Sequence, residues 1–149
     1  AEAVAGLLQK RGLKNVAVIP HEGAHPYVCG EWIQNPEAPT ALLYAHHDVQ
    51  PAGRENLWKS DPFVPTLRDG PGGQRLWGRG TSDDKAGVLV HVAAISAFLE
   101  STGELPINVK ILIEGEEEVG SSHLTSFLKA HRERLQADAL ILTDTANYD

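Results

Sequence analysis

The chain has few of the features that mark secreted, membrane-spanning or nucleic-acid-binding proteins. Its single cysteine, Cys29, cannot form an internal disulfide, which favours a reducing, cytoplasmic environment. No apolar run approaches the roughly 20 residues that cross a bilayer, so we expect no membrane partner. Basic residues are scarce: 13 against 20 acidic ones give a net charge of −7, which argues against a nucleic-acid partner.

Methionine is absent altogether, even at position 1, so we expect the natural protein to begin before Ala1. The length of 149 residues is about that of one domain and is enough to bury an ordinary core. An apolar fraction of 42% and a charged fraction of 22% are typical of a globular protein rather than a disordered one. We therefore interpret residues 1–149 as one domain-sized part of a longer chain.

The pattern of apolar residues predicts alternating strands and helices. Periodic apolar positions predict helices at residues 1–11, 85–100 and 121–135. Apolar or β-branched runs predict strands at residues 15–19, 26–33, 42–45, 76–77, 107–113 and 139–142. Residues 49–73 are rich in proline, glycine and aspartate, which predicts a long irregular loop. This order is typical of an α/β fold with a mainly parallel sheet flanked by helices.

Acidic residues and histidines gather directly after several of the predicted strands. Because the carboxyl ends of strands in an open α/β sheet converge on one crevice, we expect these side chains to meet there. Imidazole and carboxylate groups together suit a divalent metal ion, and metal-assisted hydrolysis is the natural chemistry of such a site. The residues concerned are His46, His47, Asp48, Asp83, Asp84, Glu114, Glu116, Glu117, Glu118 and Asp144.

His46 and Asp48 have the spacing of a metal-binding histidine and its carboxylate partner. A histidine that binds metal through one nitrogen usually donates its other N–H to a carboxylate. Because side chains alternate along an extended chain, Asp48 would share a face with His46, whereas His47 would point the other way. We therefore predict that Asp48 orients His46.

Each group also has a simpler interpretation. His46 and Asp48 could belong to a surface turn, and either Asp83 or Asp84 could simply cap the helix that follows. The run of glutamates could be a solvated face, and Asp144 could be a turn residue. However, carboxylates clustered without a cation would repel one another and raise their own pKa values, and a metal ion removes that objection.

Three segments resemble the M20 family of zinc metallopeptidases, most closely its dipeptidase and carnosinase-type members. Residues 44–51 read YAHHDVQP and are similar to the family pattern Y-[GA]-H-x-D-V-x-P. Residues 78–85, GRGTSDDK, are similar to G-R-G-x-x-D-x-K, and residues 114–121, EGEEEVGS, to E-G-x-E-E-x-G-S. The resemblance covers most of the chain from Leu42 to Asp144 and places the motifs in the family's order.

The resemblance implies a zinc-exopeptidase-like fold and two Zn²⁺ ions per complete active site, with Mn²⁺ or Co²⁺ as possible replacements. Asp83 would bridge the two metal ions, while His46 and Asp144 would complete one of them. Glu118 would bind the other ion, and Glu117 would act as general base. By the same resemblance, Asp48 would orient His46 and the Asp83–Asp84 peptide bond would be cis.

The resemblance also implies that parts of the family's architecture lie outside this sequence. Family members have a smaller domain that pairs subunits into a homodimer and helps to bind substrate, and a final histidine ligand late in the chain. None of His91, His123 and His131 lies in a matching segment, so we expect them to be packing or surface residues. We therefore expect residues 1–149 to be the N-terminal part of the catalytic domain and to hydrolyse little on their own.

Three other functions remain open at the level of sequence. An N-acyl-amino-acid deacylase would use the same metal centre on an acyl group instead of a dipeptide or small peptide. A non-catalytic metal-binding domain could retain the fold, but it would have no need of Glu117. A calcium site is disfavoured because His46 is a poor ligand for a hard cation.

Overall fold

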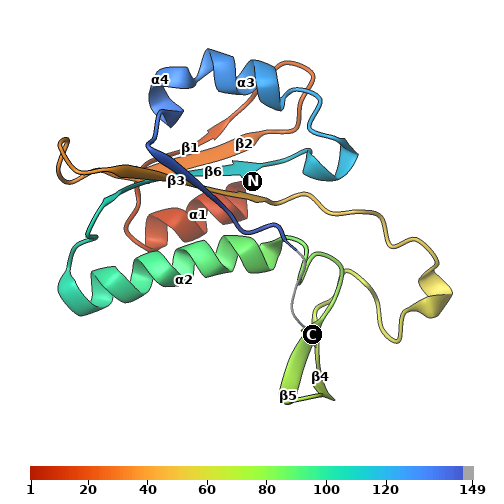
Figure 1. The fold of residues 1–149 in the computed structure, drawn as a ribbon. Helices are drawn as coiled ribbons and strands as arrows, with labels where there is room; N and C mark the ends of the chain where they lie inside the picture. Colours follow the sequence, from red (N-terminus) through yellow and green to blue (C-terminus); the bar gives the residue numbers. More distant parts are fainter. Residues whose placement is uncertain (146–149) are drawn as a thin grey trace.

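The computed structural model describes residues 1–145, and its centre is a five-stranded sheet with the strand order β1-β2-β6-β3-β7 (Figure 1). The strands are β1 (Lys14–Ile19), β2 (Tyr27–Trp32), β3 (Thr40–His46), β6 (Asn108–Glu114) and β7 (Ala139–Leu142). Helices α1 (Glu2–Lys10) and α2 (Lys85–Thr102) cover one face of the sheet. Helices α3 (Leu124–Ala130) and α4 (Arg132–Leu135) lie over the other face. In the part of the chain that is described, no helix is long and apolar enough to cross a membrane.

The expected α/β architecture is confirmed, and the sheet within it is mixed. Strand β3 pairs in parallel with both β6 and β7, whereas β1–β2 and β2–β6 are antiparallel. Strands β1 and β2 are joined by a short loop, and a connection of that kind returns the chain in the opposite direction. The path from β3 to β6 runs instead through α2, which is the crossover that parallel strands require.

The parallel strands β6, β3 and β7 bring their carboxyl ends to the same edge of the sheet. His46 at the end of β3 is paired with Glu114 at the end of β6, and Tyr44 is paired with Leu142 at the end of β7. The residues that follow these strands therefore begin side by side, which is the arrangement predicted for a site in an open α/β sheet.

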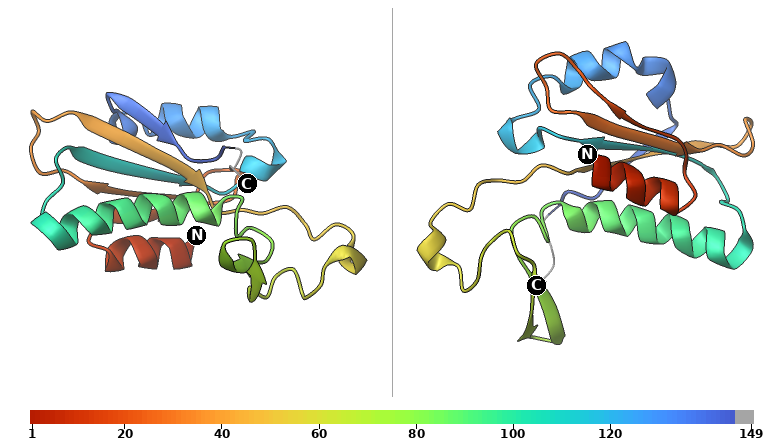
Figure 2. Two further views of the ribbon diagram at one scale, coloured as in Figure 1. Left: turned by 60° about the horizontal axis from the view of Figure 1, so that its bottom comes forward. Right: turned by 180° about the vertical axis from the view of Figure 1, so that it is seen from behind.

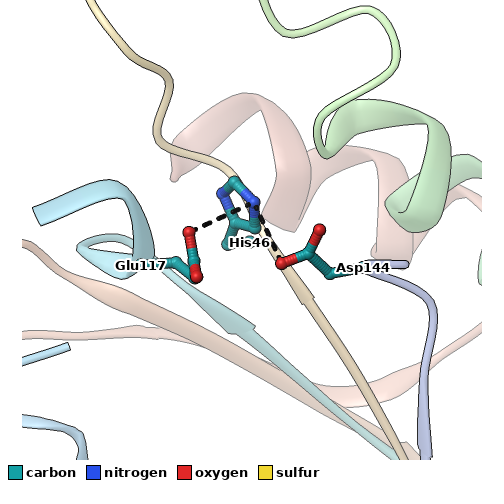
Figure 3. A group of neighbouring side chains, drawn as sticks. All are labelled: His46, Glu117 and Asp144. Carbon is teal, nitrogen blue, oxygen red and sulfur yellow. Dashed lines mark ion pairs between the residues drawn. The ribbon is translucent and has the colours of Figure 1, made fainter. Parts of the chain in front are cut away.

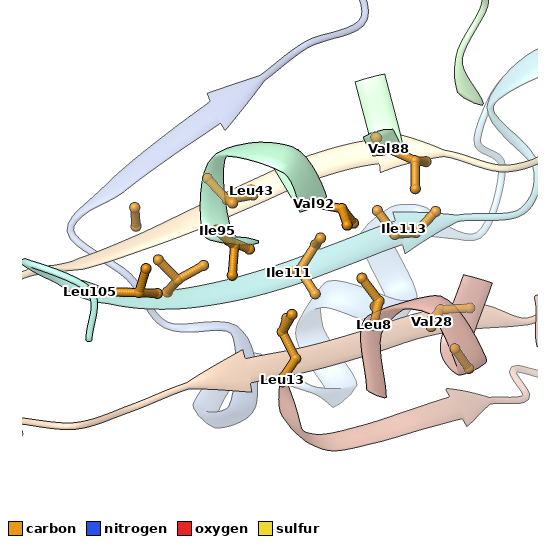
Figure 4. Close-up of a cluster of buried hydrophobic side chains, with 14 residues drawn as sticks. Leu8, Leu13, Val28, Leu43, Val88, Val92, Ile95, Leu105, Ile111 and Ile113 are labelled. Carbon is orange, nitrogen blue, oxygen red and sulfur yellow. The ribbon is translucent and has the colours of Figure 1, made fainter. Parts of the chain in front are cut away.

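Two apolar cores hold the helices against the sheet. Between the sheet and α1 and α2, Leu8, Val92 and Ile111 belong to a cluster of buried aliphatic side chains (Figure 4). On the opposite face, Phe127 of α3 stacks on Tyr27 of β2, with ring centroids 3.8 Å apart. The buried cores leave the carboxyl edge of the sheet clear for polar residues.

Most of the predicted elements are present, but the region predicted as an irregular loop contains a hairpin. After the short 3₁₀ turn Glu55–Leu57, β4 (Thr66–Gly70) pairs with β5 (Gly73–Trp77), and this hairpin projects away from the main sheet (Figure 2). The loop prediction was wrong for residues 66–70 and 73 because β4, with the sequence TLRDG, has one large apolar residue, whereas the apolar pair Leu76-Trp77 at the end of β5 was predicted as a strand. The helix predicted at residues 121–135 is two helices, which meet at His131.

The buried thiol of Cys29 supports a labelling prediction. Cys29 is 1% exposed, and burial raises its pKa to about 11, although the charge of Arg134 opposes this shift. Because the thiolate is the reactive form, we expect very slow alkylation by iodoacetamide at pH 8 in native buffer and fast alkylation in urea. Mass spectrometry gives a direct readout because the chain has one cysteine. Rapid labelling of the folded chain would contradict the burial of this thiol.

Candidate metal centre

The centre of the site is the imidazole of His46, which is wholly buried at the end of β3. Its Nε2 atom lies 3.0 Å from Asp83 Oδ1, 3.8 Å from Glu117 Oε2 and 3.8 Å from Asp144 Oδ2. Figure 3 shows Glu117 and Asp144 approaching this nitrogen from opposite sides. Three separate segments thus direct carboxylates at one nitrogen, and one ligand atom each from His46, Glu117 and Asp144 lie within 4.8 Å of one another.

Asp48 joins His46 to the turn that carries the glutamates. Its Oδ1 lies 3.2 Å from His46 Nδ1 and accepts a hydrogen bond from the backbone N–H of Glu117 at 3.2 Å. Its Oδ2 accepts from the backbone N–H of Glu118 at 3.0 Å. The neighbours of Nδ1 are acceptors, so Nδ1 carries a proton. Nε2 also faces acceptors, and it can offer its lone pair only where a cation takes the place of its proton. Asp48 therefore sets both the orientation of His46 and the position of the turn.

Asp83 and Asp84 have different roles: one faces His46 and the other caps α2. Their peptide bond is cis, as the resemblance implied. Asp84 is buried, and its carboxylate caps α2 by accepting from Gly87 N at 3.1 Å. Its other oxygen accepts from His46 N at 3.2 Å. Asp83 is 62% exposed and is directed at His46 Nε2, so Asp84 is the capping residue and Asp83 the candidate ligand.

Glu118 is placed beside the centre rather than in it. Its Oε1 accepts a hydrogen bond from Gln50 N at 3.2 Å, and its backbone carbonyl accepts from Gln50 Nε2 at 2.6 Å. Within residues 1–145, the ligand atoms that lie within 4.8 Å of one another come from His46, Glu117 and Asp144 but from neither Asp83 nor Glu118, although Asp83 Oδ1 lies 3.0 Å from His46 Nε2. The predicted residues His46, Asp48, Asp83, Glu117 and Asp144 are therefore brought together, and Glu118 lies on the adjoining turn.

The charged groups of the site shift one another's pKa values. Burial lowers the pKa of His46, but the surrounding carboxylates, first among them Asp48, outweigh burial and raise it. Partial burial raises the pKa of Glu117, and the charge of Asp144 adds to this effect while His46 opposes it. A buried imidazole facing several carboxylates is a donor set for Zn²⁺ or a similar divalent ion, and such a cation would offset their mutual repulsion. The residues present therefore fit a metal ion.

Two glutamates of the acidic run are structural, which the sequence alone did not reveal. Glu114 is fully buried and accepts from the Tyr44 hydroxyl at 2.6 Å. Glu116 is 3% exposed and accepts from the backbone N–H of His123 at 2.7 Å. The simpler interpretation of the run as a solvated face is therefore wrong for these two residues. For Glu114 the available signal was its position at the end of β6, a strand that is buried along almost its whole length.

Of the three histidines that were predicted on helices, His91 lies in α2, whereas His123 and His131 stand at the two ends of α3. His91 is buried, with Nε2 2.9 Å from the carbonyl oxygen of Tyr44. The ring of His123 lies against the Glu116 carboxylate, with Nδ1 3.0 Å from Oε2. The ring of His131 lies 4.4 Å from that of Phe127, measured between centroids.

Known proteins share both the sequence motifs and the fold. The Cys-Gly metallodipeptidase dug1 of Schizosaccharomyces pombe is 38% identical over 122 residues, which are 80% of this chain and 25% of that protein. The Beta-Ala-His dipeptidase of Homo sapiens is also 38% identical, over 121 residues, or 80% of this chain and 23% of that protein. The chain thus spans about a quarter of the length of these curated relatives.

The crystal structure of human carnosine dipeptidase 1 superimposes with a TM-score of 0.82 at 34% identity, over 98% of this chain and 32% of that one. Residues 42–148 match the sequence profile of peptidase family M20/M25/M40, and this span includes His46, Asp83, Glu117 and Asp144. By sequence and by fold, the chain belongs to peptidase family M20/M25/M40.

Proposed function

We propose that this chain forms part of the catalytic domain of a metal-dependent dipeptidase. The observation that carries the proposal is the convergence of Asp83, Glu117 and Asp144 on Nε2 of the buried His46. The names of the matched relatives, Cys-Gly metallodipeptidase and Beta-Ala-His dipeptidase, support a dipeptide as substrate.

His46, Asp83 and Asp144 would hold one Zn²⁺ ion, and Asp83 and Glu118 would hold a second. Mn²⁺ or Co²⁺ could occupy the same set of nitrogen and oxygen donors. Bound zinc would polarise the scissile amide carbonyl and lower the pKa of the attacking water. Asp48 would keep the Nε2 lone pair of His46 directed at the metal position, because its carboxylate accepts a hydrogen bond from the Nδ1–H group.

Glu117 would be the general base. Its carboxylate lies 3.8 Å from His46 Nε2 and stands at the edge of the site, with 36% of its side chain exposed. Its raised pKa suits a group that takes a proton from water and then returns it to the leaving amine. Asp48 also positions this residue, because it accepts the Glu117 backbone N–H.

We propose that the complete protein is longer than these 149 residues, since they span about a quarter of the length of the matched relatives. We propose that residues 1–149 alone hydrolyse little, because the second metal position lacks a ligand and the family's substrate-binding domain lies outside them. We also propose a cytoplasmic location, in line with the single cysteine of the chain, and a homodimer, which the family resemblance implies for the complete protein.

Zinc titration tests the metal centre directly. We expect the 149-residue chain to bind close to one equivalent of Zn²⁺ by calorimetry and His46→Ala to abolish this binding, since it removes the central nitrogen ligand. His131→Ala removes a histidine that packs on Phe127 and should bind zinc normally. No zinc binding by the folded chain would contradict the proposed metal centre in these residues.

Substitution of Glu117 separates the roles of base and ligand. In the complete protein we expect Glu117→Gln to lower kcat by about 10²–10⁴-fold, the usual contribution of a general base, with little change in zinc affinity. Asp144→Asn should weaken zinc binding, and Glu133→Gln, an acidic residue of α4, should change neither quantity. If Glu117→Gln weakens zinc binding as much as Asp144→Asn does, Glu117 is a ligand and the proposed base is wrong.

A substrate panel tests the reaction class. We expect the complete protein to cleave dipeptides faster than acetyl- or succinyl-amino acids, as judged by kcat/KM for each compound. We expect this preference because the matched relatives are named as dipeptidases. Cleavage confined to the acyl compounds would identify an N-acyl-amino-acid deacylase instead.

A further inference from the structure

Asp144 follows the most exposed of the three parallel strands that end at the site. It follows β7, a four-residue strand at the edge of the sheet whose side chains are all exposed. The ladder between β7 and β3 ends at the pair Tyr44–Leu142, before Asp144 is reached. Burial and sheet pairing therefore do not by themselves fix the position of the Asp144 carboxylate, although it lies 3.8 Å from His46 Nε2.

The residue between the ladder and Asp144 is tied to the interior by a hydrogen-bonded group. Thr143 Oγ1 lies 3.1 Å from His91 Nε2 and donates to the carbonyl oxygen of Tyr44 at 3.4 Å. His91 Nε2 itself lies 2.9 Å from the same carbonyl. Because a carbonyl oxygen only accepts, Nε2 carries a proton, and the threonine hydroxyl can accept from it while donating to Tyr44. Burial also lowers the pKa of His91, which favours the neutral ring.

Gly87 leaves the space in which this contact forms. A Cβ atom at Gly87 would lie 2.5 Å from Thr143 Oγ1 and would collide with the Asp84 carboxylate. The side of α2 that faces the site thus combines a glycine with two buried polar residues: Asp84 holds the backbone of His46, and His91 holds Thr143. Helix α2 and its capping residue Asp84 therefore contact both the segment that carries His46 and the segment that carries Asp144.

We propose that His91 is a positioning residue that sets Asp144 in the metal centre through the Thr143 hydroxyl. The inference rests on the proposed function, because it assigns His91 a purpose only where Asp144 binds metal. The alternative is a purely structural role, in which His91 satisfies the buried carbonyl of Tyr44 and the threonine contact has no consequence. The two roles differ in what happens to zinc affinity when only the threonine is changed.

Thr143 variants test this with little disturbance of the core, since Thr143 is only partly buried. Thr143→Val keeps the shape of the side chain and removes the hydroxyl, and we expect it to weaken zinc binding by about tenfold, as loss of a ligand's supporting partner typically does. Thr143→Ser restores the hydroxyl and should restore affinity. Thr145→Val makes the same change on the exposed residue after Asp144 and should have no effect.

A double-mutant cycle assigns the effect to the histidine. His91→Phe should weaken zinc binding in the same way, and adding Thr143→Val to it should cause no further loss, because both changes break one contact. Should His91→Phe fail to fold, the Thr143→Val and Thr143→Ser pair still decides the question.

The outcomes separate this inference from the proposal beneath it. Zinc binding that requires His46 but is unchanged in Thr143→Val would overturn the positioning role and leave the metal centre intact. A Thr143→Val chain that is less stable without metal, yet binds zinc with unaltered affinity, would show a structural role only. Absence of zinc binding by the unmodified chain would refute the metal centre and this inference with it.

Discussion

The buried imidazole of His46 is the feature on which the site depends. It has no exposed surface, so its two nitrogens must both find partners within the protein. Asp48 occupies one side, and the carboxylates of Asp83, Glu117 and Asp144 face the other. A ring fixed in this way can present one lone pair in one direction, and the excess of negative charge around it favours a divalent cation at that point.

The scaffold around this ring uses the same elements for packing and for the site. Strands β3, β6 and β7 are parallel, so their ends meet at one edge, and the apolar residues of β3 and β6 are buried behind it. Helix α2 packs on the sheet through Val92 and Ile95 while its first turn holds the backbone of His46 through Asp84. A shift of this helix would therefore disturb the core and the site together.

Neighbouring acids with identical chemistry have different roles because their side chains point to different places. Glu114 and Glu116 are buried among Tyr44, Tyr27 and His123, whereas Glu117 faces His46 and Glu118 contacts Gln50. The division between Asp84, buried as a helix cap, and the exposed Asp83 follows the same rule. Position on the strand or turn, more than residue type, decides which carboxylate is available for chemistry.

The sequence by itself determined the α/β class, most of the strands and helices and the family motifs, because buried aliphatic runs and helical periodicity are local signals. It also predicted that His46, Asp83, Glu117 and Asp144 would converge, since each follows a predicted strand. For Asp83 the reason differs, because the strand before it belongs to the separate hairpin and the start of α2 brings Asp83 to the site. Only the tertiary structure decided the antiparallel pairing of β1 and β2, the exposed hairpin of β4 and β5, and the contact of His91 with Thr143. These features join residues distant in sequence or lack an apolar pattern, so they depend on how the whole chain packs.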